Sequence, residues 1–219
     1  MSIRRLIYQS GLLPVQRAPV PVIIVGNISI GGTGKTPLVI WLANYLKQNG
    51  FNPGIISRGY GGAAKFWPQQ VRGDSDPHMV GDEPVIIARR TRCPVAVSPN
   101  RYSAIEGLIK HKQCDIIISD DGLQHLAMAR DIEIVVIDGI RRFGNKRCLP
   151  AGPLRESAHR LKKIDMIVSY GLPGKGEHHM EYIPLPLRLL IDEEKQCDLD
   201  QFKKNTVHAV AGTGYPARF

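Results

Sequence analysis

A glycine-rich segment that directly follows a short apolar run constrains the fold of this chain more than any other feature. The run is Val22–Val25, and it continues as Gly26-Asn-Ile-Ser-Ile-Gly-Gly-Thr-Gly-Lys-Thr-Pro37. A strand that leads into such a turn, with a helix after it, is typical of loops whose backbone N–H groups surround phosphate oxygens. The segment therefore predicts a phosphate-binding loop with these nucleotide-binding residues: Ser29, Ile30, Gly31, Gly32, Thr33, Gly34, Lys35 and Thr36.

Two side chains of this loop have separate expected roles, and one residue departs from the common pattern. Lys35 would reach the β- and γ-phosphates, and the Thr36 hydroxyl would bind Mg²⁺. Ser29 stands where the pattern G-x-x-x-x-G-K-[ST] has its first glycine. A glycine-rich turn before an ordinary helix is the alternative interpretation.

Short apolar runs alternate with helical apolar stripes along the rest of the chain. Strands are expected at about 22–27, 54–58, 94–98, 115–121, 132–137 and 165–170, and helices at 38–46, 83–90, 101–111 and 150–156. This alternation predicts an α/β fold of the P-loop NTPase-like class. Its sheet would be mostly parallel and covered by helices on both faces.

Three segments are expected along the chain. Residues 1–19 contain a short amphipathic stretch that would lie on a membrane surface or pack on the domain as a frayed terminal helix. Residues 20–170 would form the nucleotide-binding core. Residues 171–219 begin with a glycine-rich turn and would form a linker and the beginning of a second, smaller α/β unit. Its strands are expected at 182–191 and 206–211.

The charge of the chain is unevenly distributed. The formal net charge is +9, and no acidic residue precedes Asp74. An anionic partner would explain this basic N-terminal third, and a solvated basic face is the alternative. The four cysteines lie far apart without a C-x-x-C pair, so the sequence indicates neither a disulfide framework nor a zinc site. Nucleic acid is not an expected partner, because interleaved aromatic residues and a recognisable module are absent.

Two carboxylates at the end of a predicted strand are candidate ligands for the metal ion of a nucleotide site. Asp120 and Asp121 close the apolar strand at 115–121 and are expected to bind Mg²⁺, directly or through water. A pair of exposed turn aspartates is the alternative. Gln124 and His125 follow closely and would face the γ-phosphate, although a lone histidine is more often structural.

Asp82 begins the predicted helix at 83–90 and has two interpretations. Considered alone, it is best explained as an N-cap that accepts backbone N–H groups. A catalytic carboxylate is the alternative. Four further residues are ambiguous one by one, because a surface arginine usually has no specific role. Their position in loops on the carboxyl side of strands makes them candidates that line the site: Arg58, Arg101, Arg155 and Glu156.

Six motifs, in order along the chain, together resemble one family closely. They are Gly26-Asn-Ile-Ser-Ile-Gly-Gly-Thr-Gly-Lys-Thr-Pro37, Ser57-Arg-Gly-Tyr60, Gly81-Asp-Glu-Pro84, Asp120-Asp-Gly-Leu-Gln-His125, Pro150-Ala-Gly-Pro-Leu-Arg-Glu156 and Ala211-Gly-Thr-Gly214. The set is similar to the tetraacyldisaccharide 4'-kinases, which phosphorylate a lipid A precursor. The resemblance covers nearly the whole chain, and Ser29 matches the family's own loop.

The resemblance implies an activity, cofactors and a location. The activity is transfer of the γ-phosphoryl group of ATP, with Mg²⁺, to the 4'-hydroxyl of a tetraacylated disaccharide 1-phosphate. Residues 20–170 would then be a P-loop kinase core. The implied location is the cytoplasmic face of the bacterial inner membrane, as a peripheral or monotopic protein. The implied partners are the acylated disaccharide lipid and an anionic membrane surface, and no obligate protein partner is evident.

The resemblance also implies roles for single residues. Asp82 matches the family's catalytic aspartate, which makes it, with Lys35, the expected catalytic pair. Thr36, Asp120 and Asp121 match metal positions, and Glu156 matches a further carboxylate near the metal. Other matched positions line the site without a defined role: Arg58, Arg101, Gln124, His125 and Arg155.

Two departures from the family lead to the expectation that the chain is a fragment of reduced or no activity. The family usually begins with an additional hydrophobic anchor, and it continues past Ala211–Gly214 into a second domain that carries a histidine partner of the catalytic aspartate. No residue of this chain is assigned that histidine's role. A nucleotide switch or a metallochaperone-type ATPase is the alternative function. It is disfavoured because the guanine-reading Asn-Lys-x-Asp and the additional lysine of the metallochaperone loop are absent.

Overall fold

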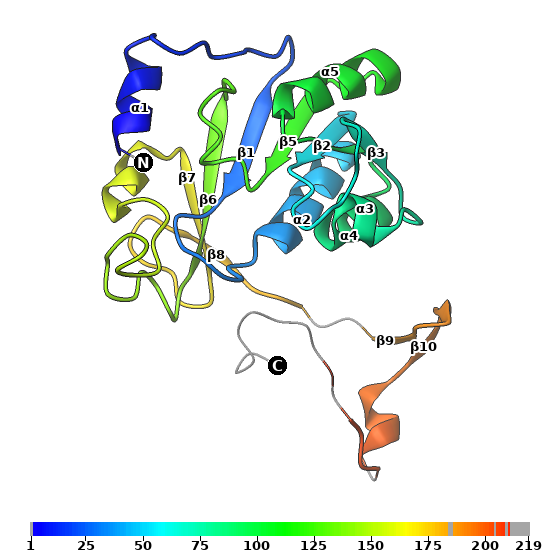
Figure 1. The fold of residues 1–219 in the computed structure, drawn as a ribbon. Helices are drawn as coiled ribbons and strands as arrows, with labels where there is room; N and C mark the ends of the chain where they lie inside the picture. The colour runs from blue at the N-terminus through cyan, green and yellow to red at the C-terminus, as the bar shows by residue number, and fades with distance from the viewer. Residues whose placement is uncertain (1, 184–185, 204, 209, 211–219) are drawn as a thin grey trace.

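The computed structural model of the chain describes residues 2–183, 186–203, 205–208 and 210. Its strands are β1 (Val22–Gly26), β2 (Pro53–Ser57), β3 (Gln69–Val71), β4 (Val95–Val97), β5 (Ile116–Asp120), β6 (Ile132–Asp138), β7 (Met166–Tyr170), β8 (His178–Met180), β9 (Leu187–Leu189) and β10 (Asp192–Cys197). Its helices are α1 (Ser2–Gln9), α2 (Lys35–Gln48), α3 (Pro77–Val80), α4 (Asp82–Thr91) and α5 (Arg101–Lys112), with 3-10 turns η1 (Ala158–Lys163) and η2 (Leu199–Phe202). Figure 1 shows their arrangement.

Eight strands form one sheet in the order β3-β4-β2-β5-β1-β6-β7-β8. Every neighbouring pair is parallel except β3 and β4, which are antiparallel at one edge. All five residues of each central strand β1, β2 and β5 are buried. Such strands are covered on both faces, which explains why they read as continuous apolar runs. The expected mostly parallel sheet is confirmed.

Helices cover both faces of this sheet, as the sequence predicted. On one face, α2 and α4 pack against alternate strand residues such as Val25 and Ile118. On the other face, α5 packs against Ile24 and Ile117, together with Leu123 from the loop after β5. The period-two alternation of each strand therefore divides the core into two layers around the sheet.

The residues that follow the N-terminal helix also contact the rest of the chain. α1 covers Ser2–Gln9, and its Leu6 is exposed. Farther along, Gln16 exchanges backbone hydrogen bonds with Ala127 and Ala129. None of the helices in the described part of the chain is both long and apolar enough to cross a membrane.

The C-terminal strands differ from expectation. β8 joins the main sheet beside β7. One strand was expected at 182–191, but β9 and β10 form a separate antiparallel hairpin that begins in this range and ends after it (Figure 1). Residues 206–208 and 210 have no regular secondary structure, and 209 and 211 lie outside the described residues. The motif Ala211–Gly214 lies outside them as well. The sheet continues past residue 170, and the expected division of the chain into segments stays a prediction.

The expected helix at 150–156 is absent, and turns occupy this segment. Pro153 lacks a backbone N–H and disfavours helical geometry in the residue before it, so a helix does not form there. Leu154 instead makes isolated bridges with Ser29 and Cys148. The 3-10 turn η1 begins later, at Ala158, where the Ser157 side chain caps it.

Candidate active site

The loops that follow β1, β2 and β5 meet at one edge of the sheet, because these strands are parallel neighbours. β1 leads into the phosphate loop, β2 ends at Ser57 and β5 ends at Asp120. In parallel α/β sheets, ligands bind outside the carboxyl ends of the strands. The candidate active site therefore lies at this edge, beside the N-terminus of α2 (Figure 1).

The phosphate loop, residues 27–34, is closed by a buried side chain and by two glycines. Gly31 and Gly34 have φ of 92° and 96°, a conformation that residues with a Cβ rarely adopt. Asn27 is fully buried and donates from Nδ2 to Thr33 Oγ1 over 3.1 Å. The same group lies 3.5 Å from the Gly31 carbonyl oxygen. α2 begins directly after the loop, so its unpaired first N–H groups lie where an anion would bind.

Asp121 brings two basic side chains together beside the loop. Lys35 Nζ lies 3.8 Å from Asp121 Oδ1. Arg155 Nη1 donates to both carboxylate oxygens, over 2.9 and 2.8 Å. The structure therefore brings together three of the residues that the sequence predicted for the site.

Asp120 is buried at the end of β5, with 1% of its surface exposed. Its Oδ2 accepts a hydrogen bond from the Ser57 hydroxyl over 3.4 Å, and its Oδ1 has no hydrogen-bond partner among the described residues. Burial raises the pKa of Asp120 to about 6, the negative charge of Glu83 adds to the rise, and Lys35 opposes it. A buried carboxylate oxygen without a partner is costly, so this edge of the sheet favours a bound cation.

Arg101 braces the turn that carries the two aspartates. It is 3% exposed, and Nη1 donates to the carbonyl oxygens of Ile56 and Asp120 over 3.3 and 3.0 Å. Nη2 lies 3.4 Å from the carbonyl oxygen of Asp121. Burial lowers the pKa of Arg101 to about 10, and the neighbouring aspartates partly offset this change. Arg101 therefore contacts the backbone of the site, and direct contact with a ligand stays a prediction.

Gln124 and His125 occupy the loop after the aspartates. Gln124 Nε2 donates to the Asn27 carbonyl oxygen and to Glu156 Oε1, each over 3.0 Å. His125 is half-buried, and burial lowers the pKa of its imidazole to about 4, with the positive charge of Arg101 as a further cause. The imidazole is therefore neutral at pH 7, and it is available as a hydrogen-bonding group, not as a cation.

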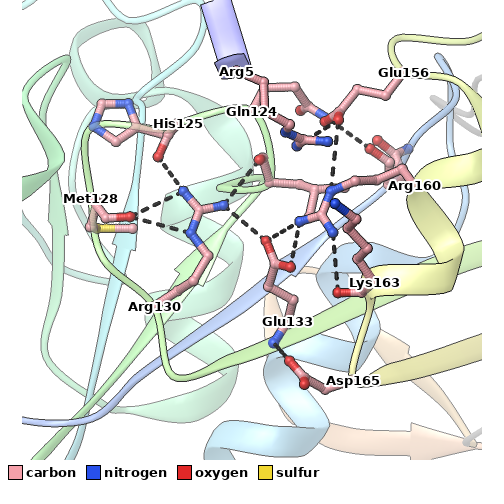
Figure 2. Close-up of polar contacts among 12 residues, drawn as sticks. Arg5, Gln124, His125, Met128, Arg130, Glu133, Glu156, Arg160, Lys163 and Asp165 are labelled. Carbon is pink, nitrogen blue, oxygen red and sulfur yellow. Dashed lines mark hydrogen bonds and ion pairs between the residues drawn. The ribbon is translucent and has the colours of Figure 1, made fainter. Parts of the chain in front are cut away.

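Glu156 contacts basic and amide side chains beside the candidate site. Its carboxylate is 5% exposed and accepts from Gln124, while Arg5 Nη2 lies 2.8 Å from Oε2 (Figure 2). Arg160 Nε lies 3.9 Å from the same oxygen. Across the described residues, no group of three or more His, Cys, Asp or Glu side chains is arranged to hold a metal. The metal-binding role of Glu156 stays a prediction.

Asp82 is exposed and is the first residue of α4. The residue before it, Gly81, occupies the N-cap position. Asp82 Oδ1 accepts only the backbone N–H of Glu83 among the hydrogen bonds in the described part of the chain. The capping interpretation is therefore weakened. A Cβ on Gly81 would lie 2.8 Å from the Tyr60 carbonyl oxygen, so this glycine lets α4 approach the loop that contains Arg58.

The comparison with known families agrees with this arrangement. A family model described as "Tetraacyldisaccharide-1-P 4'-kinase" (LpxK) matches residues 1–219, which is the whole chain. The chain belongs to the tetraacyldisaccharide-1-P 4'-kinase family. The match includes the phosphate loop and the two strand-end aspartates described above.

Curated relatives in this kinase family are about 50% identical to the chain over the aligned residues. The tetraacyldisaccharide 4'-kinase of Nitrosococcus oceani is 52% identical over 219 residues, which are 100% of this chain and 64% of that protein. The enzyme of Aeromonas salmonicida is 50% identical over 218 residues, 99% of this chain and 65% of that protein. The chain thus spans slightly less than two thirds of the length of these relatives.

A solved structure of the family has the same fold. The crystal structure of LpxK from Aquifex aeolicus in complex with ATP superposes with a TM-score of 0.78 at 30% sequence identity. The superposition covers 94% of this chain and 67% of that one. The P-loop NTPase-like α/β fold predicted from the sequence is confirmed.

Sequence reasoning missed two contacts on the phosphate loop of this LpxK-family chain. Arg141 Nη2 donates to the Ile30 carbonyl oxygen over 3.0 Å, and the basic loop after β6 was a signal for such a contact. The Tyr182 hydroxyl lies 2.7 Å from the position that a Cβ on Gly34 would occupy. The Tyr182 ring stacks on Tyr170, with centroids 4.3 Å apart. No local pattern in the sequence predicts that the segment after β8 reaches the loop.

Proposed function

We propose that this protein is an ATP-dependent kinase that transfers the γ-phosphoryl group to the 4'-hydroxyl of a tetraacyldisaccharide 1-phosphate in lipid A biosynthesis. One observation carries the proposal: a phosphate loop, its Lys35 and the buried Asp120 lie at one edge of the sheet, in a chain of this kinase family. The chain spans 64% to 66% of the first relatives, so activity and substrate are proposals for the protein as a whole.

The phosphate loop would bind the triphosphate of ATP. Backbone N–H groups of residues 30–34 and the N-terminus of α2 provide donors for phosphate oxygens. Lys35, now 3.8 Å from Asp121, would pair with the β- and γ-phosphates. The contact of Arg155 Nη1 with both carboxylate oxygens would keep the Asp121 charge compensated when Lys35 turns to the nucleotide.

The oxygen ligands at this edge fit Mg²⁺. Thr36, Asp120 and Asp121 supply hydroxyl and carboxylate oxygens, which Mg²⁺ prefers, and it commonly takes only one or two carboxylates beside substrate phosphates. The unpartnered Asp120 Oδ1 supports this assignment. When bound, Mg²⁺ would offset negative charge on the phosphate oxygens. Glu156 would join this site only if it left its present contacts with Arg5 and Gln124.

Asp82 would act on the acceptor. In the transfer, the 4'-oxygen forms a bond to the γ-phosphorus, the bond from that phosphorus to the β,γ-bridging oxygen breaks, and the hydroxyl proton moves to the Asp82 carboxylate. Asp82 is exposed, and within the described residues its carboxylate accepts a hydrogen bond only from the Glu83 N–H. Both observations support this role, because the carboxylate is accessible to a substrate hydroxyl.

The membrane partner of the proposal is an anionic lipid surface. The basic N-terminal third of the chain, with no acidic residue before Asp74, supports attraction to such a surface. The proposed location is the cytoplasmic face of the bacterial inner membrane, with the protein attached peripherally. There the acylated disaccharide 1-phosphate would be presented to the nucleotide edge of the sheet.

A transfer assay tests the proposal. The chain is incubated with γ-³²P-labelled ATP, Mg²⁺ and tetraacyldisaccharide 1-phosphate in detergent micelles, and the lipids are separated. Label in the lipid above the level obtained with Lys35→Ala is the expected result. Release of labelled inorganic phosphate without labelled lipid would contradict the proposal and favour the nucleotide-switch alternative.

A further inference from the structure

The N-terminal helix is connected to the phosphate loop through a line of polar contacts that are partly or fully buried. Arg5 on α1 pairs with Glu156, and Glu156 accepts a hydrogen bond from Gln124. Gln124 also donates to the Asn27 carbonyl oxygen, and Asn27 donates to Thr33 Oγ1 inside the loop. Figure 2 shows the first part of this line, in which the side chains of Arg5 and Gln124 converge on the Glu156 carboxylate.

Each inner member of this line is held in one position. Gln124 Nε2 contacts Asn27 and Glu156 together, so movement of either acceptor disturbs the other contact. Asn27 is fully buried, and its Nδ2 lies between Thr33 Oγ1 and the Gly31 carbonyl oxygen. The orientation of Gln124 therefore affects the part of the loop that would bind phosphate.

The ion pair with Arg5 orients the Glu156 carboxylate. Arg5 Nη2 lies 2.8 Å from Oε2, whereas Arg160 Nε lies 3.9 Å from the same oxygen. This Arg160 nitrogen is buried and has no hydrogen-bond partner in the part of the chain that the structure describes. The Arg160 guanidinium is otherwise engaged by Glu133. If Arg5 loses its charge, Glu156 remains buried and its nearest remaining cation is Arg160. The carboxylate would then move toward Arg160 and away from Gln124.

We propose that Arg5 is a positioning residue of the phosphate loop, acting through Glu156, Gln124 and Asn27. The proposal rests on the proposed function, in which this loop binds ATP. It assigns to the N-terminal helix a part in ordering the nucleotide site, in addition to any contact with lipid. A displacement of about 1 Å in catalytic or binding groups is enough to weaken their action.

Hydrogen exchange and nucleotide binding test this role in the whole chain. In Arg5→Gln, the backbone amides of residues 31–34 should exchange faster without nucleotide, and the Kd of a fluorescent ATP analogue should rise several-fold. Arg4→Gln is the matched control, because Arg4 is an exposed neighbour on α1 whose guanidinium lies over the Tyr8 ring. It should leave both quantities unchanged. Arg5→Lys, which keeps the charge, should restore most of the protection.

A double variant distinguishes positioning from general stability. In a Gln124→Ala background the line is already broken, so Arg5→Gln should add no further exchange at residues 31–34. Equal exchange in Arg5→Gln and Arg4→Gln would overturn the proposal. A full additional effect of Arg5→Gln in the Gln124→Ala background would overturn it too. The exchange data need no nucleotide, so a chain that fails to bind ATP would refute the proposed function while these data still decide the role of Arg5.

Discussion

Lys35 and Asp82 are two candidate catalytic residues with different surroundings, and these surroundings determine how their substitutions should differ. Lys35 is half-buried beside the loop and pairs with Asp121 at 3.8 Å. Asp82 is exposed and accepts one N–H from the next residue, Glu83. Loss of Lys35 would therefore remove a charge from the proposed nucleotide site, whereas loss of Asp82 would leave that site intact.

Lys35→Ala should weaken ATP binding, and Asp82→Asn should not. A hydrogen bond to a charged group contributes about 1.5–3 kcal/mol, which corresponds to a rise in Kd of about 10- to 100-fold for Lys35→Ala. Asp82→Asn should keep the Kd of ATP and lose phosphoryl transfer. Equilibrium titration with a fluorescent ATP analogue and the lipid assay measure the two quantities. A loss of ATP binding in Asp82→Asn that follows a lower Tm would show that Asp82 is a structural cap.

His125 should make the stability of the protein depend on pH. Burial lowers the pKa of its imidazole from 6.5 to about 4 in the folded state. Below pH 6.5 the unfolded chain binds a proton that the folded chain does not, so this contribution to stability is present above pH 6.5 and is lost as pH falls toward about 4. Urea unfolding at pH 7 and pH 5 should show a smaller loss in His125→Gln than in the unsubstituted chain. An equal loss in both would contradict the low pKa.

At the scale of elements, the phosphate loop depends on glycine at some positions and not at others. Gly34 has φ of 96°, and a Cβ there would lie 2.7 Å from the Tyr182 hydroxyl. Gly32 has no positive φ, and a Cβ there would meet no atom of the described residues within 4 Å. The two glycines lie in the same loop, but the backbone conformation and the space require glycine only at position 34.

Gly34→Ala should destabilise the nucleotide-free protein, and Gly32→Ala should not. A left-handed conformation costs an L-residue about 1–2 kcal/mol, and the contact with Tyr182 would add to this cost. Urea denaturation should therefore show a lower free energy of unfolding for Gly34→Ala alone. Equal stability of the two variants would mean that the loop adopts another conformation in solution.

The sequence predicted the elements that depend on local pattern and missed those that depend on distant contacts. The buried strands β1, β2 and β5 were predicted because each contains a short apolar run that is followed by a glycine or a polar residue. The helix expected at 150–156 was wrong because Pro153 prevents it. β8 was missed because it is a short edge strand whose partner, β7, decides its place.

The same distinction holds for the candidate site. Lys35 and Asp121 were predicted from motifs, and the structure brings them together. Glu156 pairs with Arg5 of α1, which is about 150 residues away in the sequence. No local sequence pattern predicts a contact over such a separation. Arg101 was expected to line the site, and this role stays a prediction. Its contacts with the carbonyl oxygens of Ile56 and Asp120 follow only from the packing of α5 on the sheet.

At the scale of the whole molecule, the hairpin β9–β10 lies apart from the main sheet (Figure 1). Leu190 and Ile191 at its turn are 97% and 92% exposed, so they are not part of the core of the sheet. β8, in contrast, pairs with β7. We infer that the sheet and its helices form the stable unit, and that the hairpin opens at a lower cost.

Limited trypsin digestion should therefore cut first in the hairpin region, at the exposed Arg188, Lys195 or Lys203. A fragment that ends near residue 188 should persist, because local opening costs less there than in the sheet. Mass spectrometry of a time course measures the order of the cuts. Early cleavage after Arg58 or Lys65, before any cut in the hairpin, would contradict this order of stability.

We propose that the edge of the sheet formed by the phosphate loop and Asp120 serves phosphoryl transfer to a lipid hydroxyl. Tandem mass spectrometry of lipid incubated with the chain, ATP and Mg²⁺ tests this most directly, because it locates the transferred phosphate. We expect one added phosphate on the 4'-oxygen of the disaccharide, absent with Lys35→Ala. A lipid that stays unmodified while ATP is hydrolysed, or a phosphate at another hydroxyl, would contradict it.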